Sequence, residues 1–205
     1  MIPQADRKRS PQGIKTLTIG YDHDLERPDS GYDGWKPISF NRRHSNFEHP
    51  DRYRLNEPEN IGLRRRLAVG LAFWLSYYEH GLCRWSLRGE GPQCRWDSVD
   101  IAGLLLWTGK PAALGAKSHE NRAQDARHFL EEYTDWCNGN CYWFSLEDDH
   151  KLLDACGGFI GTEQLSEAIN EALEETDPVM VQGEAADLAP YLHLKATIVQ
   201  KGTRS

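Results

Sequence analysis

Residues 73–107 constrain the fold most, because three apolar segments of strand length follow one another with short turns between them. The segments 73–78 and 82–87 flank Glu79-His80-Gly81, and glycine at the third position supplies the positive φ that a tight connection requires. Residues 101–107 form an apolar run short enough for a buried strand. The sequence therefore predicts an antiparallel meander in the middle of the chain.

Four tryptophans recur every eleven residues through this meander, at Trp74, Trp85, Trp96 and Trp107. Successive side chains of a strand point to opposite faces, and turns interrupt this segment. An odd spacing of eleven residues therefore need not place the indoles on one face. We interpret the spacing as a result of core packing. We expect Trp96 to be largely buried, and Asp97 to be hydrogen-bonded to backbone or to one of three cationic side chains, Arg42, Arg43 and His80.

Two amphipathic helices are predicted on either side of a second hairpin. Residues 120–136 carry apolar side chains at intervals of three and four and stop at Asn138-Gly139. Residues 163–175 show a similar stripe, with Thr162 as a candidate N-cap. Between them, the segments 141–146 and 152–156 predict the hairpin, and Gly157-Gly158-Phe159-Ile160-Gly161 predicts a tight strand-to-helix turn, with a phosphate cradle as the alternative.

The remaining elements are less regular. Strands are predicted at 15–21, 36–41 and 192–199, and a helix is predicted to open at Pro58-Glu59, with Arg64, Arg65 and Arg66 facing solvent. Clusters of strands separated by three helices, without strict βαβ alternation, indicate the α+β class. We expect a single domain over residues 14–200, with a mainly antiparallel twisted sheet of about six or seven strands packed by about three helices. Residues 1–13 predict a disordered leader and residues 201–205 a frayed tail.

Composition narrows the class of protein. A hydrophobic content of 39% is enough for a packed core, and the net charge of −7 argues against general binding to nucleic-acid backbones. The sequence holds no run of eighteen apolar residues and no secretory signal, which predicts a soluble cytoplasmic protein without a membrane partner.

The five cysteines favour reduced thiols, because their number is odd and a chain of this size needs no disulfide staples. Cys137 and Cys141 have a spacing that two zinc ligands can adopt, but no second Cys or His pair accompanies them. We therefore expect no structural zinc and no resident cofactor.

Two polar patterns carry possible catalytic chemistry. Asp22 and Asp24 end a predicted strand and, joined by Asp97 and Asp100, would present hard oxygen ligands to a divalent cation. A simpler interpretation is that the first two carboxylates open a polar loop. Glu79 and His80 would form a general acid/base pair if the hairpin turn rotated them onto one face, since adjacent strand residues otherwise point apart.

A third pattern predicts anion binding. Arg42-Arg43-His44 follows a predicted strand, and arginine binds phosphates and carboxylates in bidentate geometry. Four acidic residues close by in the sequence are candidates to neutralise it: Asp29, Asp33, Glu48 and Asp51.

The order of several motifs resembles a family of uncharacterised proteins of bacteriophages and mobile elements. The matching elements are Tyr21-Asp22-His23-Asp24, Phe40-Asn41-Arg42-Arg43, Tyr77-Tyr78-Glu79-His80-Gly81, Arg95-Trp96-Asp97-Ser98, Cys141-Tyr142-Trp143-Phe144 and Cys156-Gly157-Gly158-Phe159-Ile160-Gly161. The chain departs from the family pattern at Glu79, where the family has Asp, and at Val99-Asp100, where it has Gly-Gln. The resemblance implies a small accessory protein in a bacterial cytosol, acting against host defence.

No complete catalytic motif is present, so the sequence favours a non-catalytic protein that binds a host protein or a small anionic ligand. The expected contact residues are Arg42, Arg43, His44, Tyr78, Glu79, His80, Trp85, Trp96 and Asp97. Among them, Glu79, His80 and Asp97 are also the candidate catalytic residues. Two alternatives stay open: a metal-dependent hydrolase or nuclease that uses Asp22, Asp24 and Asp97, with His80 as a further candidate, and an acidic DNA mimic.

Overall fold

The computed structural model describes residues 13–31, 33–55, 60–115, 117–175 and 177–199. The predicted leader, apart from Gly13, and the predicted tail lie outside these residues. The chain divides into two compact units, each with its own hydrophobic core. Of the described residues, those from Gly13 to Leu25 and from Gly139 to Val199 form the first unit, and those between Glu26 and Asn138 form the second. A single domain was expected over residues 14–200, and the described residues in that range form two hydrophobic cores.

The predicted α+β class is confirmed. The described residues form three α-helices and nine strands, and most neighbouring strands are antiparallel. The strands were expected in one sheet of about six or seven. They are divided instead between a five-stranded and a four-stranded sheet.

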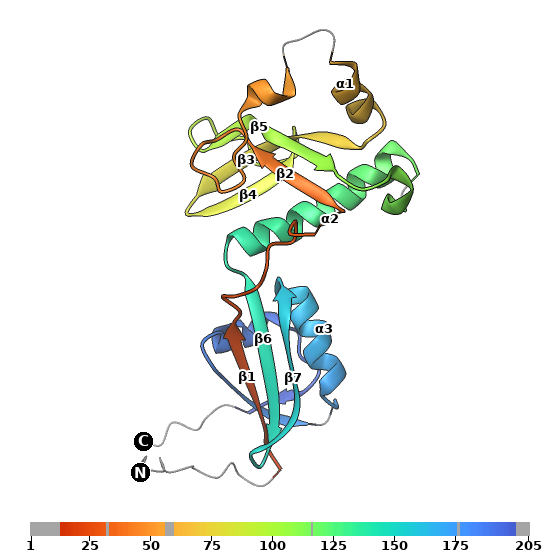
Figure 1. Ribbon diagram of the computed structural model, residues 1–205. Helices are drawn as coiled ribbons and strands as arrows, with labels where there is room; N and C mark the ends of the chain where they lie inside the picture. The colour runs from red at the N-terminus through yellow and green to blue at the C-terminus, as the bar shows by residue number, and fades with distance from the viewer. Residues whose placement is uncertain (1–12, 32, 56–59, 116, 176, 200–205) are drawn as a thin grey trace, which may run out of the picture. The chain divides into compact units, whose positions relative to one another are not determined.

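The first unit is built on a sheet in the order β7-β6-β1-β8-β9. Its elements are β1 (Lys15–Tyr21), β6 (Cys141–Asp148), β7 (Lys151–Ile160), α3 (Thr162–Ala172), β8 (Pro178–Gln182) and β9 (Thr197–Ile198). Figure 1 shows α3 beside β6 and β7. Leu165 and Ile169 of α3 are fully buried in a core with Leu17 and Ile19 of β1, as the stripe of apolar residues predicted.

Three predictions in the first unit are corrected. Gly157 to Ile160 continue β7 rather than forming a turn, and the helix N-cap is Gly161 at φ 77°, not Thr162. The segment 192–199 contains only the two-residue strand β9, because a 3₁₀ helix, Ala186–Tyr191, precedes it. The strand β8 was missed, since Pro178 suggested only the end of a helix.

The second unit holds an antiparallel sheet in the order β2-β5-β3-β4. Its elements are β2 (Trp35–Ser39), a 3₁₀ helix (Pro50–Tyr53), α1 (Ile61–Ala68), β3 (Ala72–His80), β4 (Leu82–Leu87), β5 (Ser98–Trp107), a second 3₁₀ helix (Pro111–Leu114) and α2 (His119–Cys137). Helix α2 lies against one face of this sheet (Figure 1), where Ala126 and Leu130 join Leu75 and Leu105 in the core.

The predicted hairpin, meander and helix of this unit are confirmed, with Gly81 at φ 79° in the connection. Two side chains differ from expectation. Trp96 is 83% exposed, because it lies in the loop before β5 and not on a strand. Arg66 does not face solvent, since its guanidinium donates to the backbone oxygens of Leu71 and Trp107.

Candidate functional site

The second unit contains an open pocket of about 310 Å³ at the end of the sheet where β3 and β4 are joined. Its lining comes from the loop after β2, from β3, from β4 and from the last turn of α2. The residues are His44, Ser45, Asn46, Tyr77, Glu79, Gly81, Cys83, Trp85, Tyr133, Trp136, Cys137 and Asn138. This volume lies at the lower end of the range of small-molecule sites, about 300–1,000 Å³.

Strand alternation explains which side chains reach the pocket. Tyr77 and Glu79 are two positions apart on β3, and Cys83 and Trp85 are two positions apart on β4, so each pair shares a face. Tyr77 lies opposite Trp85 and Glu79 opposite Cys83 across the hairpin. The four side chains therefore form one continuous patch on the face that α2 covers.

Two side chains at the end of α2 form hydrogen bonds with the backbone of β4 and hold the helix against this strand. Strand β4 is an edge of the sheet, which leaves N–H and C=O groups without a neighbouring strand. Asn138 Oδ1 accepts from the N–H of Cys83 at 2.9 Å, and Asn138 Nδ2 donates to its carbonyl at 3.0 Å. Thr134 Oγ1 accepts from the N–H of Trp85 at 3.1 Å. The helix thus takes the place of a further strand and closes one side of the pocket.

Aromatic rings form most of the pocket wall. Tyr77 and Trp85 have ring centroids 4.6 Å apart, and His44 meets Tyr77 edge-on, also at 4.6 Å. On the helix, Tyr133 stacks against Trp136 with centroids 6.3 Å apart. These separations fall in the range of favourable aromatic pairs, about 4.5–7 Å. Trp85 and Tyr133 are nearly fully buried, at 5% and 2% exposed, so the half-buried Tyr77 and Trp136 offer most of the ring surface that a planar ligand could meet.

His44 is fixed from behind by the end of β2. Its Nδ1 lies 2.8 Å from the hydroxyl of the fully buried Ser39, whose Oγ also accepts from the N–H of Asn41. Burial lowers the pKa of His44, although the charge of Glu79 opposes this. We assign a neutral imidazole that accepts at Nδ1 from Ser39 and carries its proton on Nε2.

The charges around the pocket favour a neutral or cationic group inside it. Burial raises the pKa of both Tyr77 and Tyr133, which keeps the two phenols protonated. Glu79 brings a carboxylate, and its charge contributes to the shift at Tyr77. Since the imidazole of His44 is neutral, no positively charged side chain in the lining neutralises the carboxylate of Glu79.

Three of the nine contact residues predicted from the sequence lie in the pocket: His44, Glu79 and Trp85. Tyr78 and His80 alternate to the other face of β3. His80 Nδ1, one of the partners expected for Asp97, lies 3.3 Å from Asp97 Oδ2, and the side-chain hydrogen bond to this oxygen comes from the Cys94 thiol. Glu79 and His80 thus point apart, so they do not form the acid/base pair considered above. The exposed Trp96 stacks with Arg95 at 5.3 Å and lines no part of this pocket.

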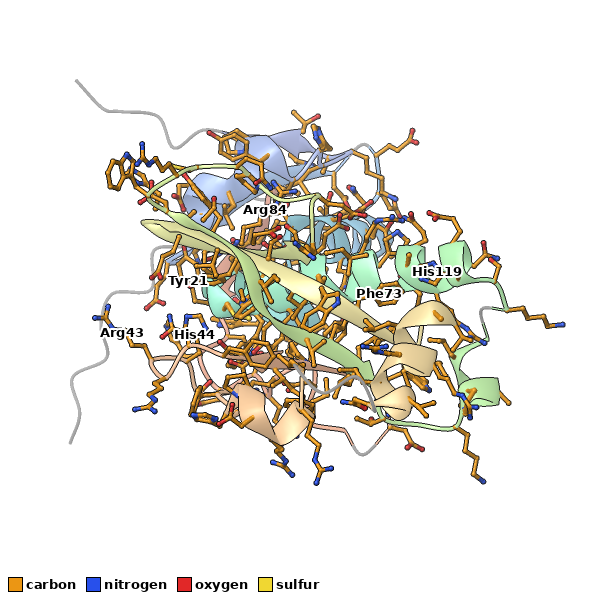
Figure 2. All side chains as sticks on the ribbon, turned by 90° about the horizontal axis from the view of Figure 1, so that it is seen from above. Tyr21, Arg43, His44, Phe73, Arg84 and His119 are labelled. Atoms are coloured by element: carbon orange, nitrogen blue, oxygen red, sulfur yellow. The ribbon has the colours of Figure 1, made fainter. Side chains whose placement is uncertain are left out.

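Arg42 and Arg43 are exposed on the loop that carries His44, and Figure 2 labels Arg43 and His44 on this loop. Within the described part of the chain, no ion pair holds either guanidinium. Three of the acidic neighbours are paired with other cations: Asp29 with Arg27, Glu48 with Lys36 and Arg52, and Asp51 with His49. The two arginines therefore remain available to an anion on the loop that leads to His44.

The four candidate metal ligands have other partners or belong to different units. Asp22 Oδ2 accepts from the N–H of Gly158 in the first unit, which also contains Asp24. In the second unit, Asp100 pairs with Arg88, and Asp97 with His80. No three His, Cys, Asp or Glu side chains among the described residues gather in a way that would hold a metal ion.

Sequence reasoning missed the helical half of the pocket. Tyr133, Trp136 and Cys137 recur at intervals of three and four, which predicts a shared helix face but not its neighbour. Asn138 was interpreted only as a helix stop. The available signal was the alternation of Tyr77, Glu79, Cys83 and Trp85 across the hairpin.

Comparison with protein-family models, with curated proteins and with solved structures finds no match to this chain. Among the helices of the described residues, none combines the length and the apolar character needed to cross a membrane.

Proposed function

We propose that this chain is a non-catalytic accessory protein that binds a small phosphorylated aromatic ligand, of the mononucleotide class, in the pocket of its second unit. The observation that carries the proposal is the pair of half-buried rings of Tyr77 and Trp136, supported by the buried Trp85 and Tyr133, in a pocket that holds one carboxylate. Stacking on such a surface is worth about 1–3 kcal/mol per base in nucleic-acid recognition.

The polar groups suit the parts of such a ligand. Glu79 would accept from an exocyclic amino group, and the Nε2–H of His44 would donate to a ring nitrogen or carbonyl. The phosphate would stay outside the acidic pocket and meet Arg42 and Arg43 on the neighbouring loop. This division of charge accounts for a small anionic ligand in a protein with a net charge of −7.

The phage-type resemblance supports a role in which binding itself is the activity. A protein that sequesters a nucleotide needs a preformed pocket but no catalytic base or metal. We propose that the chain acts in this way in the cytosol of a bacterial host, against a defence that uses the ligand.

Binding can be measured by isothermal titration with a panel of nucleosides and their monophosphates. We expect at least one monophosphate to bind tighter than its nucleoside, and the preference to disappear in Arg43→Ala. Arg84→Ala is the matched control, because Arg84 is an exposed arginine on the β4 face away from the pocket.

The aromatic wall is tested separately. Trp136→Ala should weaken binding of nucleoside and nucleotide alike, whereas Trp96→Ala, which removes an exposed indole outside the pocket, should not. A panel without any binding at millimolar concentration, or loss of binding in Trp96→Ala alone, would contradict the proposal.

A further inference from the structure

We propose that Cys83 and Cys137 form a redox-sensitive modification site, in which a peroxide converts their two thiols to an intramolecular disulfide and an external dithiol restores them. Both cysteines are free, and both line the same pocket. This inference goes beyond ligand binding and does not depend on it.

The fold brings the two cysteines together from different elements. Cys83 is on the edge strand β4, and Cys137 is the last residue of α2. Asn138, the next residue along the chain, bonds both backbone groups of Cys83. This two-point contact fixes the position of the helix end along β4, so that residue 137 lies beside residue 83. Cys83 is half-buried and Cys137 is exposed, which gives a small oxidant access.

The pair has an attacking and a resolving member. A hydrogen bond from the Cys137 thiol lowers the pKa of Cys83, while burial and the charge of Glu79 act in the opposite direction. The same contact raises the pKa of Cys137. Since the thiolate is the nucleophile, Cys83 is the sulfur that reacts first.

The chemistry balances with hydrogen peroxide as the oxidant. The Cys83 thiolate attacks one peroxide oxygen and the O–O bond breaks, which leaves a sulfenic acid at Cys83. The departing hydroxide takes a proton and becomes water. The Cys137 sulfur then attacks the Cys83 sulfur, the S–O bond breaks, and the second hydroxide leaves as water with the thiol proton. Two thiols lose two electrons in total, and one peroxide is reduced to two waters. A dithiol reverses the oxidation by thiol–disulfide exchange.

The other three cysteines lack this arrangement. Cys94 Sγ donates to Asp97 at 3.3 Å, and Cys156 is an exposed thiol whose Sγ lies 3.7 Å from the carbonyl of Gly157. Cys141 is buried in the core of the first unit. The site therefore predicts loss of two specific thiols rather than general oxidation.

The test is to treat the folded full-length protein with a small excess of hydrogen peroxide and to count thiols after denaturation. We expect the count to fall from five to three, and to return to five after treatment with dithiothreitol. Cys83→Ser and Cys137→Ser should each stop at a sulfenic acid or remain unreacted, without loss of a second thiol. Cys94→Ser and Cys156→Ser are the matched controls, and each should still lose two thiols.

Peptide mapping needs one more variant. No lysine or arginine lies between Arg127 and Lys151, so trypsin leaves Cys137 and Cys141 on one peptide. The crosslink to the Cys83 peptide should persist in Cys141→Ala and vanish in Cys137→Ser. A folded parent protein that keeps five thiols under peroxide, or a crosslink that persists in Cys137→Ser, would overturn the inference. Because the first measurement uses the unsubstituted chain, it does not depend on the folding of any variant.

Discussion

Asn138→Ala tests whether a side chain really replaces a strand at the edge of the second sheet. The substitution removes two hydrogen bonds to Cys83, at 2.9 and 3.0 Å, and leaves the backbone unchanged, because the residue has φ −87° and ψ 0°. These angles are those of the third residue of a type I turn, a conformation with negative φ that is open to alanine. The effect therefore reports the side chain alone.

The expected magnitude follows from the number of bonds. A typical intramolecular hydrogen bond contributes about 0.5–1.5 kcal/mol to stability, so two should contribute about 1–3 kcal/mol. For a chain of about this size, each kcal/mol of lost stability lowers the Tm by roughly 2–4 °C. Urea denaturation followed by tryptophan fluorescence measures the free energy of unfolding, and differential scanning calorimetry measures Tm.

Amide hydrogen exchange gives a local measurement. In Asn138→Ala the N–H of Cys83 should exchange faster, whereas the N–H of Trp85, which donates to Thr134 Oγ1, should stay protected. Asn121→Ala is the control, because it makes the same substitution at an exposed position near the start of the same helix. The reasoning is refuted if the two variants have equal free energies of unfolding and the exchange rate at Cys83 does not change.

Three further predictions concern stability. The lowered pKa of His44 means that the unfolded chain binds a proton first, so stability should fall as the pH drops below about 6.5, and this part of the fall should be absent in His44→Gln. Gly103→Ala should cost about 3 kcal/mol, the upper end of the usual cost of overpacking, because a Cβ there would lie 1.9 Å from the carbonyl oxygen of Ile38. This oxygen cannot move without separating β2 from β5. Asp97→Ala should cost less than about 1 kcal/mol, since its partners are His80, which is 75% exposed, and the thiol of Cys94, which is a weak donor.

Each of these has its own measurement and control. Urea titrations of the parent and His44→Gln at a series of pH values should diverge on the acid side, and parallel curves would contradict the assignment of a neutral imidazole. Gly31→Ala should be nearly neutral in the same assay, since its Cβ would meet only a backbone oxygen at 3.8 Å. Thermal melts of Asp97→Ala and of the parent protein should differ little, and a large difference would restore a structural role for Asp97.

Local patterns predicted most elements of the fold. The strand at Lys15–Tyr21, the hairpin through Gly81 and the helix ending before Asn138 all follow from residue periodicity and turn chemistry. The division into two units was not predictable in this way. It arises because β1 pairs with β6, which lies beyond the whole second unit in the sequence, and no local pattern indicates which strands will pair.

Some features of the candidate site were likewise predictable from the sequence, and others were not. Sequence alone determined that His44, Glu79 and Trp85 were candidates, because polar and aromatic residues at strand ends and hairpins are typical of binding sites. Only the tertiary structure decided that Glu79 and His80 face apart, that Trp96 is exposed, and that α2 brings Cys137 beside Cys83. The physical reason is that residue spacing determines the face of an element on which a side chain lies. The neighbour of that face is determined by the long-range contacts of the assembled unit.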